Sequence, residues 1–354
     1  MTWFVTPWGG EVQGVENAHQ VWARRDGWLL ALCDSGQVSF GEATPLPGFG
    51  VDGLAALDPA LLPPPVDDLD AVESLAGAVA WPSARFAVET ALLDRIARRR
   101  GQSLARLLGA AELTAPRSVL AGALLANDCL ALARAHVARG ARTLKLKALG
   151  RDLDEEGRQL GELRRLLGPH VALRLDLNGG LDAGAAREAL ALYAVHGIEL
   201  CEEPATGPEL LKLEAGATPW FADESATSPE MFAALLEHPG CAGFVLKPTL
   251  IGGLLASIGR ARRAVAAGKQ AVTSHAFEGP VALAAASELA LVLGAGTAHG
   301  LDRHAALAAF PPLTLPQLPE RAPLVVAASG GAVVVFGKEL RLGPGHALVV
   351  RCSD

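Results

Sequence analysis

Five charged side chains follow five successive apolar runs of this chain. Lys147 ends the run Thr-Leu-Lys-Leu-Lys, Asp176 follows Leu-Arg-Leu, and Glu202 follows Leu-Cys. Asp223 then follows Phe-Ala, and Lys247 follows Phe-Val-Leu. Successive members are 29, 26, 21 and 24 residues apart, about the length of one β-strand, one helix and two loops. Because parallel strands of a barrel bring their carboxyl ends to one face, the spacing predicts that these side chains share a site.

The three carboxylates have the chemistry of a metal site. Oxygen ligands without His or Cys favour a hard cation, so Asp176, Glu202 and Asp223 predict bound Mg²⁺, with Mn²⁺ as a possible substitute. Asp176 or Asp223 could instead cap the helix after its strand. The three carboxylates recur at the same spacing as the two lysines, which favours a metal site over helix capping.

Lysine is scarce in this chain, at six of the 31 basic residues, yet three of the six fall at these strand ends. Arginine does not release its proton near neutral pH, whereas lysine can when its surroundings favour it. Lys145 and Lys147 share one face of a strand, so we expect their repulsion to depress a lysine pKa and provide a base. Lys247, four strands further on, is expected across the barrel mouth. Lysines on both sides of a carboxylate could remove its α-proton and stabilise the enediolate.

Further polar residues are predicted to contact a substrate at the same face. Arg174 and Asn178 alternate with Asp176 and therefore point with it, as Lys145 points with Lys147. Ser274 ends the seventh predicted strand and suits a carboxylate or carbonyl contact. His275 follows it as either a packing residue or an alternative base.

The elements that position these residues change character along the chain. Residues 1 to about 60 predict antiparallel strands, with turns at Arg25-Asp26-Gly27 and at Asp34-Ser35-Gly36. Ser83 is expected to cap a helix that runs through Arg100. Strand and helix then alternate, with predicted strands at 117–121, 143–148, 171–177, 198–202, 219–223, 243–247, 271–274 and 296–299.

The predicted fold is α/β: a modified (β/α) barrel with an α+β capping domain built from the N-terminal region and the C-terminal segment. We expect an N-terminal capping domain at 1–113, a catalytic barrel at 114–302, and a segment at 303–354 that returns to the cap. A hairpin is predicted in that segment, with strands at 324–328 and 332–336.

Composition narrows the class of protein. The net charge of −7 and the isoelectric point near 5.8 argue against nucleic-acid binding. Five cysteines without a Cys-x-x-Cys pair predict reduced thiols. The N-terminus lacks a signal-like segment and no apolar run is long enough to span a membrane, so we expect a cytoplasmic protein. The expected partner is a small carboxylate substrate; no oligomeric state is predicted.

The motifs Lys-x-Lys, Leu-Asp-x-Asn, Glu-Glu-Pro, Ala-Asp-Glu-Ser and Leu-Lys-Pro, in this order, resemble the enolase superfamily in its muconate-cycloisomerase-like subgroup. The segment from Gly41 to Phe49 resembles the capping-domain loop of o-succinylbenzoate synthases. An exposed Phe49 at the tip of that Gly- and Pro-containing loop is expected to close over the barrel mouth.

The resemblance implies an enzyme in which Asp176, Glu202 and Asp223 hold Mg²⁺, Lys147 is the base and Lys247 the opposing lysine. The implied reaction is syn-dehydration of 2-succinyl-6-hydroxy-2,4-cyclohexadiene-1-carboxylate to o-succinylbenzoate in menaquinone biosynthesis. The alternative on the same scaffold is an N-succinylamino acid racemase or dipeptide epimerase, which would keep every motif. A metal-free Schiff-base aldolase would leave the three carboxylates without a role, and a non-catalytic barrel would be expected to have lost one of the five groups.

Overall fold

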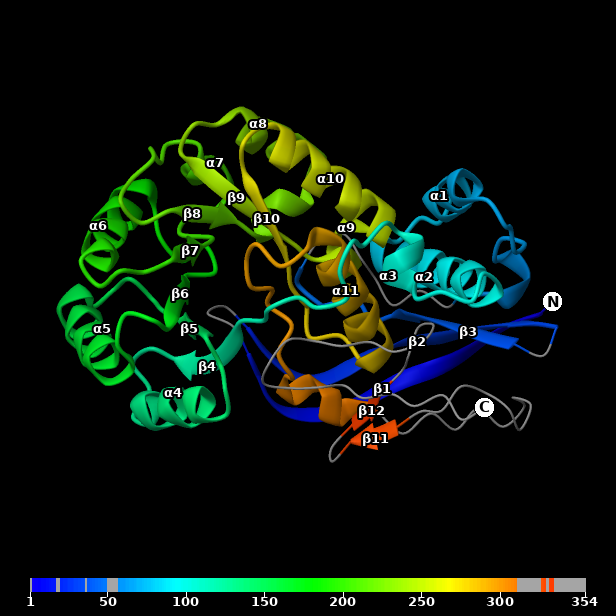
Figure 1. Ribbon diagram of the computed structural model, residues 1–354, viewed down its shortest axis with the longest axis horizontal. Coiled ribbons are helices and arrows are strands. Elements are labelled where there is room, and N and C mark those ends of the chain that lie inside the picture. Colours follow the sequence, from blue (N-terminus) through cyan, green and yellow to red (C-terminus); the bar gives the residue numbers. More distant parts are fainter. Residues whose placement is uncertain are drawn as a thin grey trace.

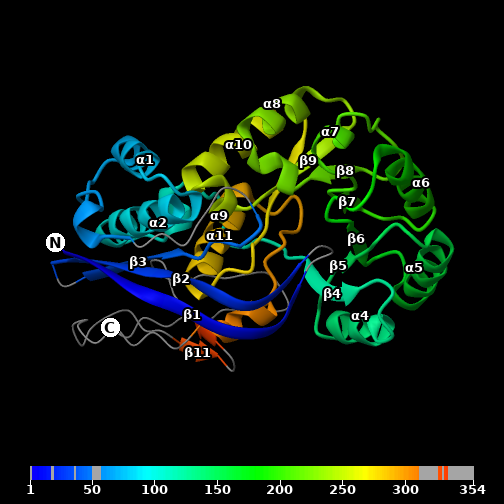
Figure 2. The same cartoon turned by 180° about the vertical axis from the view of Figure 1, so that it is seen from behind.

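The computed structural model describes residues 2–16, 20–35, 37–49, 57–310, 326–328 and 331–333 of the 354-residue chain. An antiparallel sheet with its covering helices lies beside a curled parallel sheet whose helices form the outer layer (Figure 1; Figure 2 gives the view from behind). This arrangement confirms the predicted fold class of a modified barrel with an antiparallel cap.

The antiparallel sheet has the order β1-β2-β3, with β1 at Thr2–Glu16, β2 at Val21–Asp34 and β3 at Gln37–Ala43. The turn expected at Arg25-Asp26-Gly27 is wrong, because β2 continues through these residues and pairs there with β1. The buried Arg25 side chain donates hydrogen bonds to backbone carbonyls, so burial rather than the local Asp-Gly pair decides the conformation. The second expected turn is confirmed, since Asp34 pairs with Gln37.

Three helices complete the N-terminal unit: α1 (Leu69–Gly77), α2 (Pro82–Arg99) and α3 (Leu104–Leu107). Helix α2 confirms that a helix runs to the predicted end, but the expected cap at Ser83 is wrong: the helix begins at Pro82, the N-cap position is Trp81, and Ser83 is buried in the first turn. Proline is favoured at this first position because the N–H it lacks would have no partner in the helix. Helix α2 contacts β2 and β3. It approaches β3 so closely that a Cβ at Gly41 would overlap the carbonyl oxygen of Ala87. Glycine at position 41 is therefore what allows helix and sheet to pack at this distance.

The parallel sheet contains seven strands in sequential order among the described residues. They are β4 (Val119–Ala123), β5 (Thr143–Lys147), β6 (Ala172–Asp176), β7 (Leu200–Glu202), β8 (Trp220–Ala222), β9 (Cys241–Leu246) and β10 (Gln270–Thr273). The helices that follow them are α4 (Cys129–Ala138), α5 (Leu153–Leu167), α6 (Ala183–Ala194), α7 (Gly207–Leu210), α8 (Pro229–Glu237), α9 (Pro248–Ile251), α10 (Leu254–Ala266) and α11 (Pro280–Leu293).

The eighth predicted strand, at 296–299, is not a strand. Instead, Ser274 forms an isolated parallel bridge with Gly300, and His299 forms one with Arg117. Gly296 and Gly300 flank this short segment, and glycine weakens a strand because it has no side chain to pack. Two bridges thus link the last strand of the sheet back to the segment before the first.

The capping unit and the barrel share part of one hydrophobic core. Leu254 and Ile258 of α10 and Val281 and Leu289 of α11 pack in the same cluster as the apolar residues of the N-terminal sheet. A second cluster fills the space between the parallel strands and their outer helices. Helices α10 and α11 therefore contribute to the cap as well as to the barrel.

The C-terminal hairpin is described at its centre. Strand β11 (Val326–Ala328) pairs antiparallel with β12 (Gly331–Val333), as predicted, while the rest of the predicted 303–354 segment beyond residue 310 lies outside the described residues. Three short 3₁₀ turns complete the described elements: η1 (Pro59–Leu61), η2 (Glu224–Thr227) and η3 (Ala305–Ala309). The four cysteines in the described part are free thiols. None of the helices in that part combines the length and apolar character that a bilayer crossing needs.

Candidate active site

The strand ends bring the five charged residues to one edge of the parallel sheet. Lys147 is in register with Asp176, and Asp176 with Glu202, at the last residues of β5, β6 and β7. Asp223 and Lys247 come directly after β8 and β9. Five successive strands thus deliver one of these side chains each, in the order Lys, Asp, Glu, Asp, Lys.

Lys145 lies between two of the carboxylates. Its ammonium donates to Asp176 Oδ2 at 2.9 Å and to Glu202 Oε2 at 2.7 Å. Burial by itself would lower the pKa of Lys145, but the charges of Asp176 and Glu202 outweigh burial and raise that pKa well above its usual value. The expectation that repulsion from Lys147 depresses a lysine pKa is therefore wrong for Lys145.

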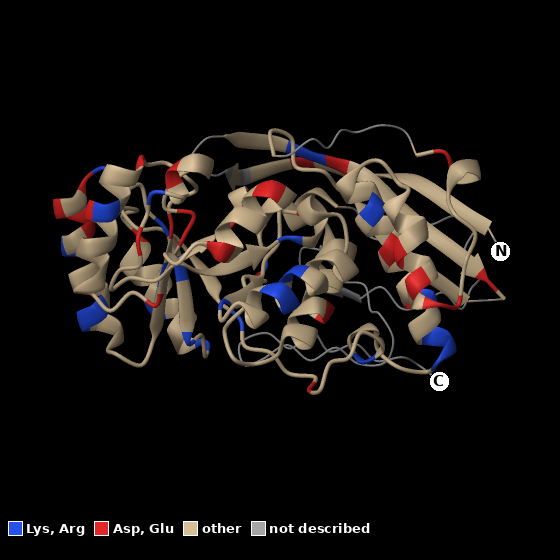
Figure 3. Cartoon of the chain, turned by 90° about the horizontal axis from the view of Figure 1, so that it is seen from above, with Lys and Arg blue, Asp and Glu red and all other residues tan. Residues whose placement is uncertain are grey.

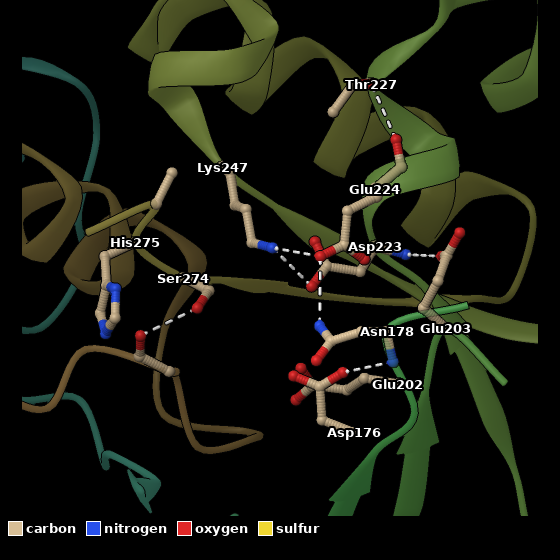
Figure 4. Close-up of polar contacts among 12 residues, drawn as sticks. Asp176, Asn178, Glu202, Glu203, Asp223, Glu224, Thr227, Lys247, Ser274 and His275 are labelled. Atoms are coloured by element: carbon tan, nitrogen blue, oxygen red, sulfur yellow. Dashed lines mark hydrogen bonds and ion pairs between the residues drawn. The ribbon is translucent and has the colours of Figure 1, made fainter. Parts of the chain in front are cut away.

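Lys247 faces the third carboxylate (Figure 4). Its ammonium lies 2.7 Å from Asp223 Oδ2 and 3.2 Å from Glu224 Oε1. Burial raises the pKa of Asp223 well above its usual value, and the neighbouring charge of Glu224 raises it further. The pKa of Lys247 is also raised, because the two carboxylates outweigh its burial. Asp223 thus carries a buried charge that one lysine compensates only in part.

Glu203 holds the backbone that carries Asp223. Its carboxylate accepts hydrogen bonds from the backbone N–H of Asp223, at 2.6 Å, and of Ser225, at 3.0 Å, and from the Ser225 hydroxyl. Burial raises the pKa of Glu203 to about 8. The two glutamates of the Glu-Glu-Pro motif therefore have different surroundings: Glu202 contacts Lys145, and Glu203 shapes the next loop.

The carboxylate group fits a divalent cation by its own chemistry. Asp176, Glu202 and Asp223 offer only oxygen donors, the preference of Mg²⁺. Both oxygens of Asp223 are buried and receive no hydrogen bond of normal geometry. Asp176 and Glu202 already share a positively charged group, the Lys145 ammonium. Three buried carboxylates with so few hydrogen-bond donors favour the binding of a further positive charge.

A second cluster of potential ligands borders the pocket, which His275 lines. Ligand atoms of His275, Glu278 and His304 lie within 4.8 Å of one another. His275 Nδ1 accepts the backbone N–H of Phe277, and Glu278 accepts from the Thr249 hydroxyl and from the backbone N–H of Ala276. Because these bonds already use His275 and Glu278, we assign the cluster to packing of the loop after β10.

One pocket extends from the carboxylates to the capping unit. Its inner end is formed by Lys145, Lys147, Asp176, Asn178, Glu224 and Lys247. Its outer wall is largely apolar and includes Trp22, Leu46, Phe49, Leu120, Ala276 and Phe277. The predicted position of Phe49 at the barrel mouth agrees with this lining, and its ring centroid lies 5.9 Å from that of Trp22.

Four of the five predicted substrate contacts line the pocket: Lys145, Phe49, Asn178 and Ser274. Ser274 and Asn178 already make hydrogen bonds within the protein. The Ser274 hydroxyl donates to Gly300 O at 3.0 Å, and Asn178 Nδ2 donates to Glu224 Oε1 at 3.4 Å (Figure 4). His275 also lines the pocket, and burial lowers its pKa well below the usual value, with His304 lowering it further. His275 is therefore neutral near pH 7 and a weak base.

Arg174 does not line the pocket, so its predicted substrate contact is wrong. Its buried guanidinium donates to Glu199 Oε2 and to Ala298 O, each at 2.6 Å. Arg174 shares a strand face with Asp176 but lies two residues deeper, about 6–7 Å toward the amino end of the barrel. Lys145 pairs with Arg174 in register and still lines the pocket, so depth alone does not exclude Arg174. The difference is that the Arg174 side chain bonds Glu199 and Ala298, whereas Lys145 bonds Asp176 and Glu202.

The pocket also contains residues to which the sequence assigned no role. Glu224 follows Asp223 in the Ala-Asp-Glu-Ser motif, so its place beside Lys247 could have been inferred from that motif. Trp22 and Phe277 come from a cap strand and a barrel loop, and no sequence pattern connects them. Asp302 adds a further carboxylate to the lining.

Comparisons with known proteins agree with this fold. A model of the enolase C-terminal domain-like family matches residues 128–320, more than half of the chain. The chain therefore belongs to the enolase superfamily, and its relatives place it in the muconate-cycloisomerase subgroup. It is an enolase-superfamily enzyme.

Three curated relatives carry two kinds of activity. The chain is 32% identical to an L-Lys-D/L-Arg epimerase of Methylococcus capsulatus over 63% of its own length and 64% of that protein, just under two thirds of it. It is 29% identical to an L-Ala-D/L-Glu epimerase of Bacillus subtilis, covering 73% and 75% of the two chains. It is also 33% identical to an o-succinylbenzoate synthase of Thermosynechococcus vestitus, covering 66% and 71%.

Solved structures extend the similarity to nearly the whole fold. The substrate-liganded L-Ala-D/L-Glu epimerase from Bacillus subtilis superposes with a TM-score of 0.77 at 23% identity, over 95% and 97% of the two chains. A dipeptide epimerase from Methylococcus capsulatus, complexed with Mg and the dipeptide L-Arg-D-Lys, gives 0.71 at 25% identity, over 85% and 89%. These structural relatives thus include proteins that hold Mg²⁺ and small dipeptide substrates.

Proposed function

We propose that this enzyme inverts the α-carbon of a dipeptide or N-acylated amino acid by proton transfer between Lys147 and Lys247. One observation carries the proposal: both lysines line one pocket, and β5 and β9, which bring them there, are separated in the sheet by the three carboxylate-bearing strands. Inversion requires a proton acceptor on one side of the α-carbon and a donor on the other. The two epimerases among the relatives support this reading over the predicted synthase.

The proton balance is simple. The neutral lysine takes the α-proton, and the C–H electron pair moves into the substrate carboxylate. The protonated lysine on the other side then delivers its proton to the same carbon, so that substrate and product differ only in configuration. A divalent cation held by Asp176, Glu202 and Asp223 would neutralise the charge that develops on the substrate carboxylate.

The rest of the pocket suits such a substrate. Its apolar outer wall can bury a side chain or an acyl group, and Asp302 and Glu224 offer acceptors for an ammonium or amide N–H. The cap closes over the pocket through Phe49 and Trp22, which would exclude water from the reacting carbon.

Dehydration of the cyclohexadiene carboxylate is the second candidate function. It needs a single base, and the ion pairs of Lys247 with Asp223 and Glu224 suit a fixed cation that stabilises an enediolate. The aromatic outer wall suits a ring substrate, and a synthase is among the relatives.

One experiment separates the two functions. The Mg²⁺-loaded enzyme is incubated in deuterated water with L,L-dipeptides and N-succinyl-L-amino acids, and in parallel with the cyclohexadiene carboxylate. Epimerisation predicts α-deuteration together with a second stereoisomer. Rapid formation of o-succinylbenzoate without deuteration of any amino acid substrate would replace the epimerase by the synthase.

A further inference from the structure

Arg25 ties the capping sheet to the barrel at the pocket. It lies on β2, and its side chain is completely buried. Its guanidinium donates to the carbonyl oxygens of Pro45 at 2.7 Å and Thr44 at 3.1 Å, both in the cap, and to that of Phe277 at 2.9 Å in the barrel. A buried guanidinium is costly unless its donors are used. Here its hydrogen bonds hold two loops that are far apart in sequence.

Phe277 has a backbone conformation that needs such support. Its φ is +57°, in the left-handed region, where a residue with a bulky side chain is strained. Its carbonyl is held by Arg25, and its N–H is donated to His275 Nδ1 at 3.3 Å. A strained residue persists only when its surroundings fix it.

The strained backbone directs the Phe277 ring toward a lysine. Lys147 Nζ lies 5.7 Å from the centroid of the ring. Trp22, also on β2, packs on the same ring with a centroid distance of 6.0 Å. Strand β2 therefore contacts both the backbone and the ring of Phe277, and Phe277 in turn forms the wall beside Lys147.

The far end of this loop is anchored from the cap as well. The buried Glu42 of β3 accepts hydrogen bonds from the backbone N–H groups of Gly279, Val281 and Ala282, where α11 begins. Residues 277–282 are thus held by Arg25 on one side and by Glu42 on the other.

Lys247 has a different kind of support. Its ion pairs are with Asp223 and Glu224, which both belong to the barrel. Figure 4 shows Lys247 directed toward these two carboxylates. The two lysines that the proposed function requires are therefore positioned by different parts of the protein.

We propose that Arg25 is a positioning residue that acts on the Lys147 side of the reaction, through Phe277, and leaves the Lys247 side largely unaffected. The proposal rests on the two-lysine function and deepens it: Arg25 of the cap shapes the Lys147 side of the reacting carbon, whereas Lys247 on the other side is paired with the barrel carboxylates Asp223 and Glu224.

The test measures α-proton exchange from each enantiomer separately. Each enantiomer of an N-acylated amino acid or dipeptide is incubated with Mg²⁺-loaded full-length enzyme in deuterated water, and early deuteration is followed before the isomers mix. Lys147→Ala and Lys247→Ala first assign which enantiomer each lysine deprotonates. Arg25→Met is then expected to slow exchange of the Lys147 enantiomer roughly 10- to 100-fold, the scale of a misplaced reacting group, and to change the other less than about threefold. Arg25→Lys keeps the positive charge but has fewer hydrogen-bond donors. It should recover part of the lost exchange rate.

Two further variants guard against a general loss of structure. Arg95 is a buried arginine of the same cap whose donors reach Asp34, Val66 and Asp67, so Arg95→Met should affect both enantiomers equally. Phe277→Leu leaves Arg25 in place and removes only the ring, and it should reproduce the asymmetry if Arg25→Met does not fold. Equal loss for both enantiomers in Arg25→Met and Phe277→Leu, or no loss in either, would overturn the role of Arg25. If the wild-type enzyme exchanges neither enantiomer, the two-lysine function itself is wrong and the proposal falls with it.

Discussion

The ammonium of Lys247 lies 2.7 Å from Oδ2 of Asp223, and the two residues are only 9% and 1% exposed. Such a buried pair is weak evidence for stability, because removing both charges from water costs about as much as their attraction returns. Its place at the ends of neighbouring strands, beside two further carboxylates, is better explained by binding and catalysis. The lysines compensate only part of the buried negative charge in this site. We therefore expect the site to bind an additional cation.

Asp223→Asn should therefore make the free energy of unfolding nearly independent of the Mg²⁺ concentration. Without a divalent cation, the variant should be as stable as wild type or more stable, because it removes a poorly compensated buried charge. Saturating Mg²⁺ should stabilise the wild type by about 2–3 kcal/mol at a concentration near 100 times Kd, and the variant far less. Thermal unfolding with and without Mg²⁺ measures both effects. If Mg²⁺ raises the unfolding temperature of the two proteins equally, Asp223 is not a metal ligand. If wild-type enzyme stays fully active after chelation, the assignment of a catalytic metal is wrong.

Lys147→Arg should abolish most of the activity while leaving the fold intact. The substitution keeps a positive charge but not a group that can release its proton near neutral pH. We expect the rate to fall about 10³-fold, within the range for loss of a general base. Lys212→Arg, at an exposed lysine paired with Glu209, is the matched control and should behave as wild type. If the rate of Lys147→Arg is within about tenfold of the wild-type rate, Lys147 is not the base and another residue takes the α-proton.

Arg174→Met should affect stability rather than substrate binding. The residue is buried away from the pocket and bonds Glu199 and Ala298. Loss of two charge-assisted hydrogen bonds should cost about 2–3 kcal/mol. Denaturant unfolding should show this loss, while KM of the folded fraction stays unchanged. A raised KM with normal stability would restore the substrate contact predicted from sequence.

The cap–barrel junction should lose stability as pH rises, because two buried glutamates of the cap accept hydrogen bonds there from barrel helices. Glu42 of β3 accepts the backbone N–H of Val281 in α11, and Glu89 of α2 accepts that of Leu255 in α10. Burial raises the pKa of Glu42 and of Glu89 to about 7 from the usual 4.5, so between these values the folded state binds more protons than the unfolded state. Their contribution is fully present below pH 4.5 and is lost as pH rises through 7, by up to about 1.4 kcal/mol per pH unit for each group. Glu42→Gln and Glu89→Gln should flatten the dependence of unfolding free energy on pH between 5 and 8. An unchanged slope in both variants would contradict these assignments.

Phe49→Ala should weaken substrate binding without unfolding the cap. Phe49 packs on Trp22 and lines the pocket, and it is only partly buried against the cap core. We expect a KM increase of roughly five- to fiftyfold, corresponding to about 1–2 kcal/mol for lost aromatic contact. Leu61→Ala, at an exposed leucine of the cap, is the control and should leave KM unchanged. Unchanged kinetics in Phe49→Ala would assign Phe49 to cap packing alone.

Much of the site could be predicted because strand ends repeat. The spacing of Lys147, Asp176, Glu202, Asp223 and Lys247 reflects one strand–helix unit each, and the structure places them at successive strand ends. The existence and the end of helix α2 were predictable for a similar reason, since its periodicity is local, but its cap was misplaced from Trp81 to Ser83. Arg174 was misplaced because alternation determines a face but not which partners a long side chain reaches, and Arg174 bonds Glu199 and Ala298. The turn at Arg25 was misplaced because an Asp-Gly pair is a local signal and the burial of Arg25 is not.

The sequence by itself determined the class of fold, the family and the set of charged groups, because these depend on periods and motifs within short segments. Only the tertiary structure decided which charges meet. It placed Lys145 between Asp176 and Glu202 and so raised a pKa that the sequence predicted to fall. It also brought Arg25 to the Phe277 carbonyl, 252 residues away along the chain. The physical reason is that electrostatic and hydrogen-bond energies depend on distance and burial in space, and neither is written in the order of residues.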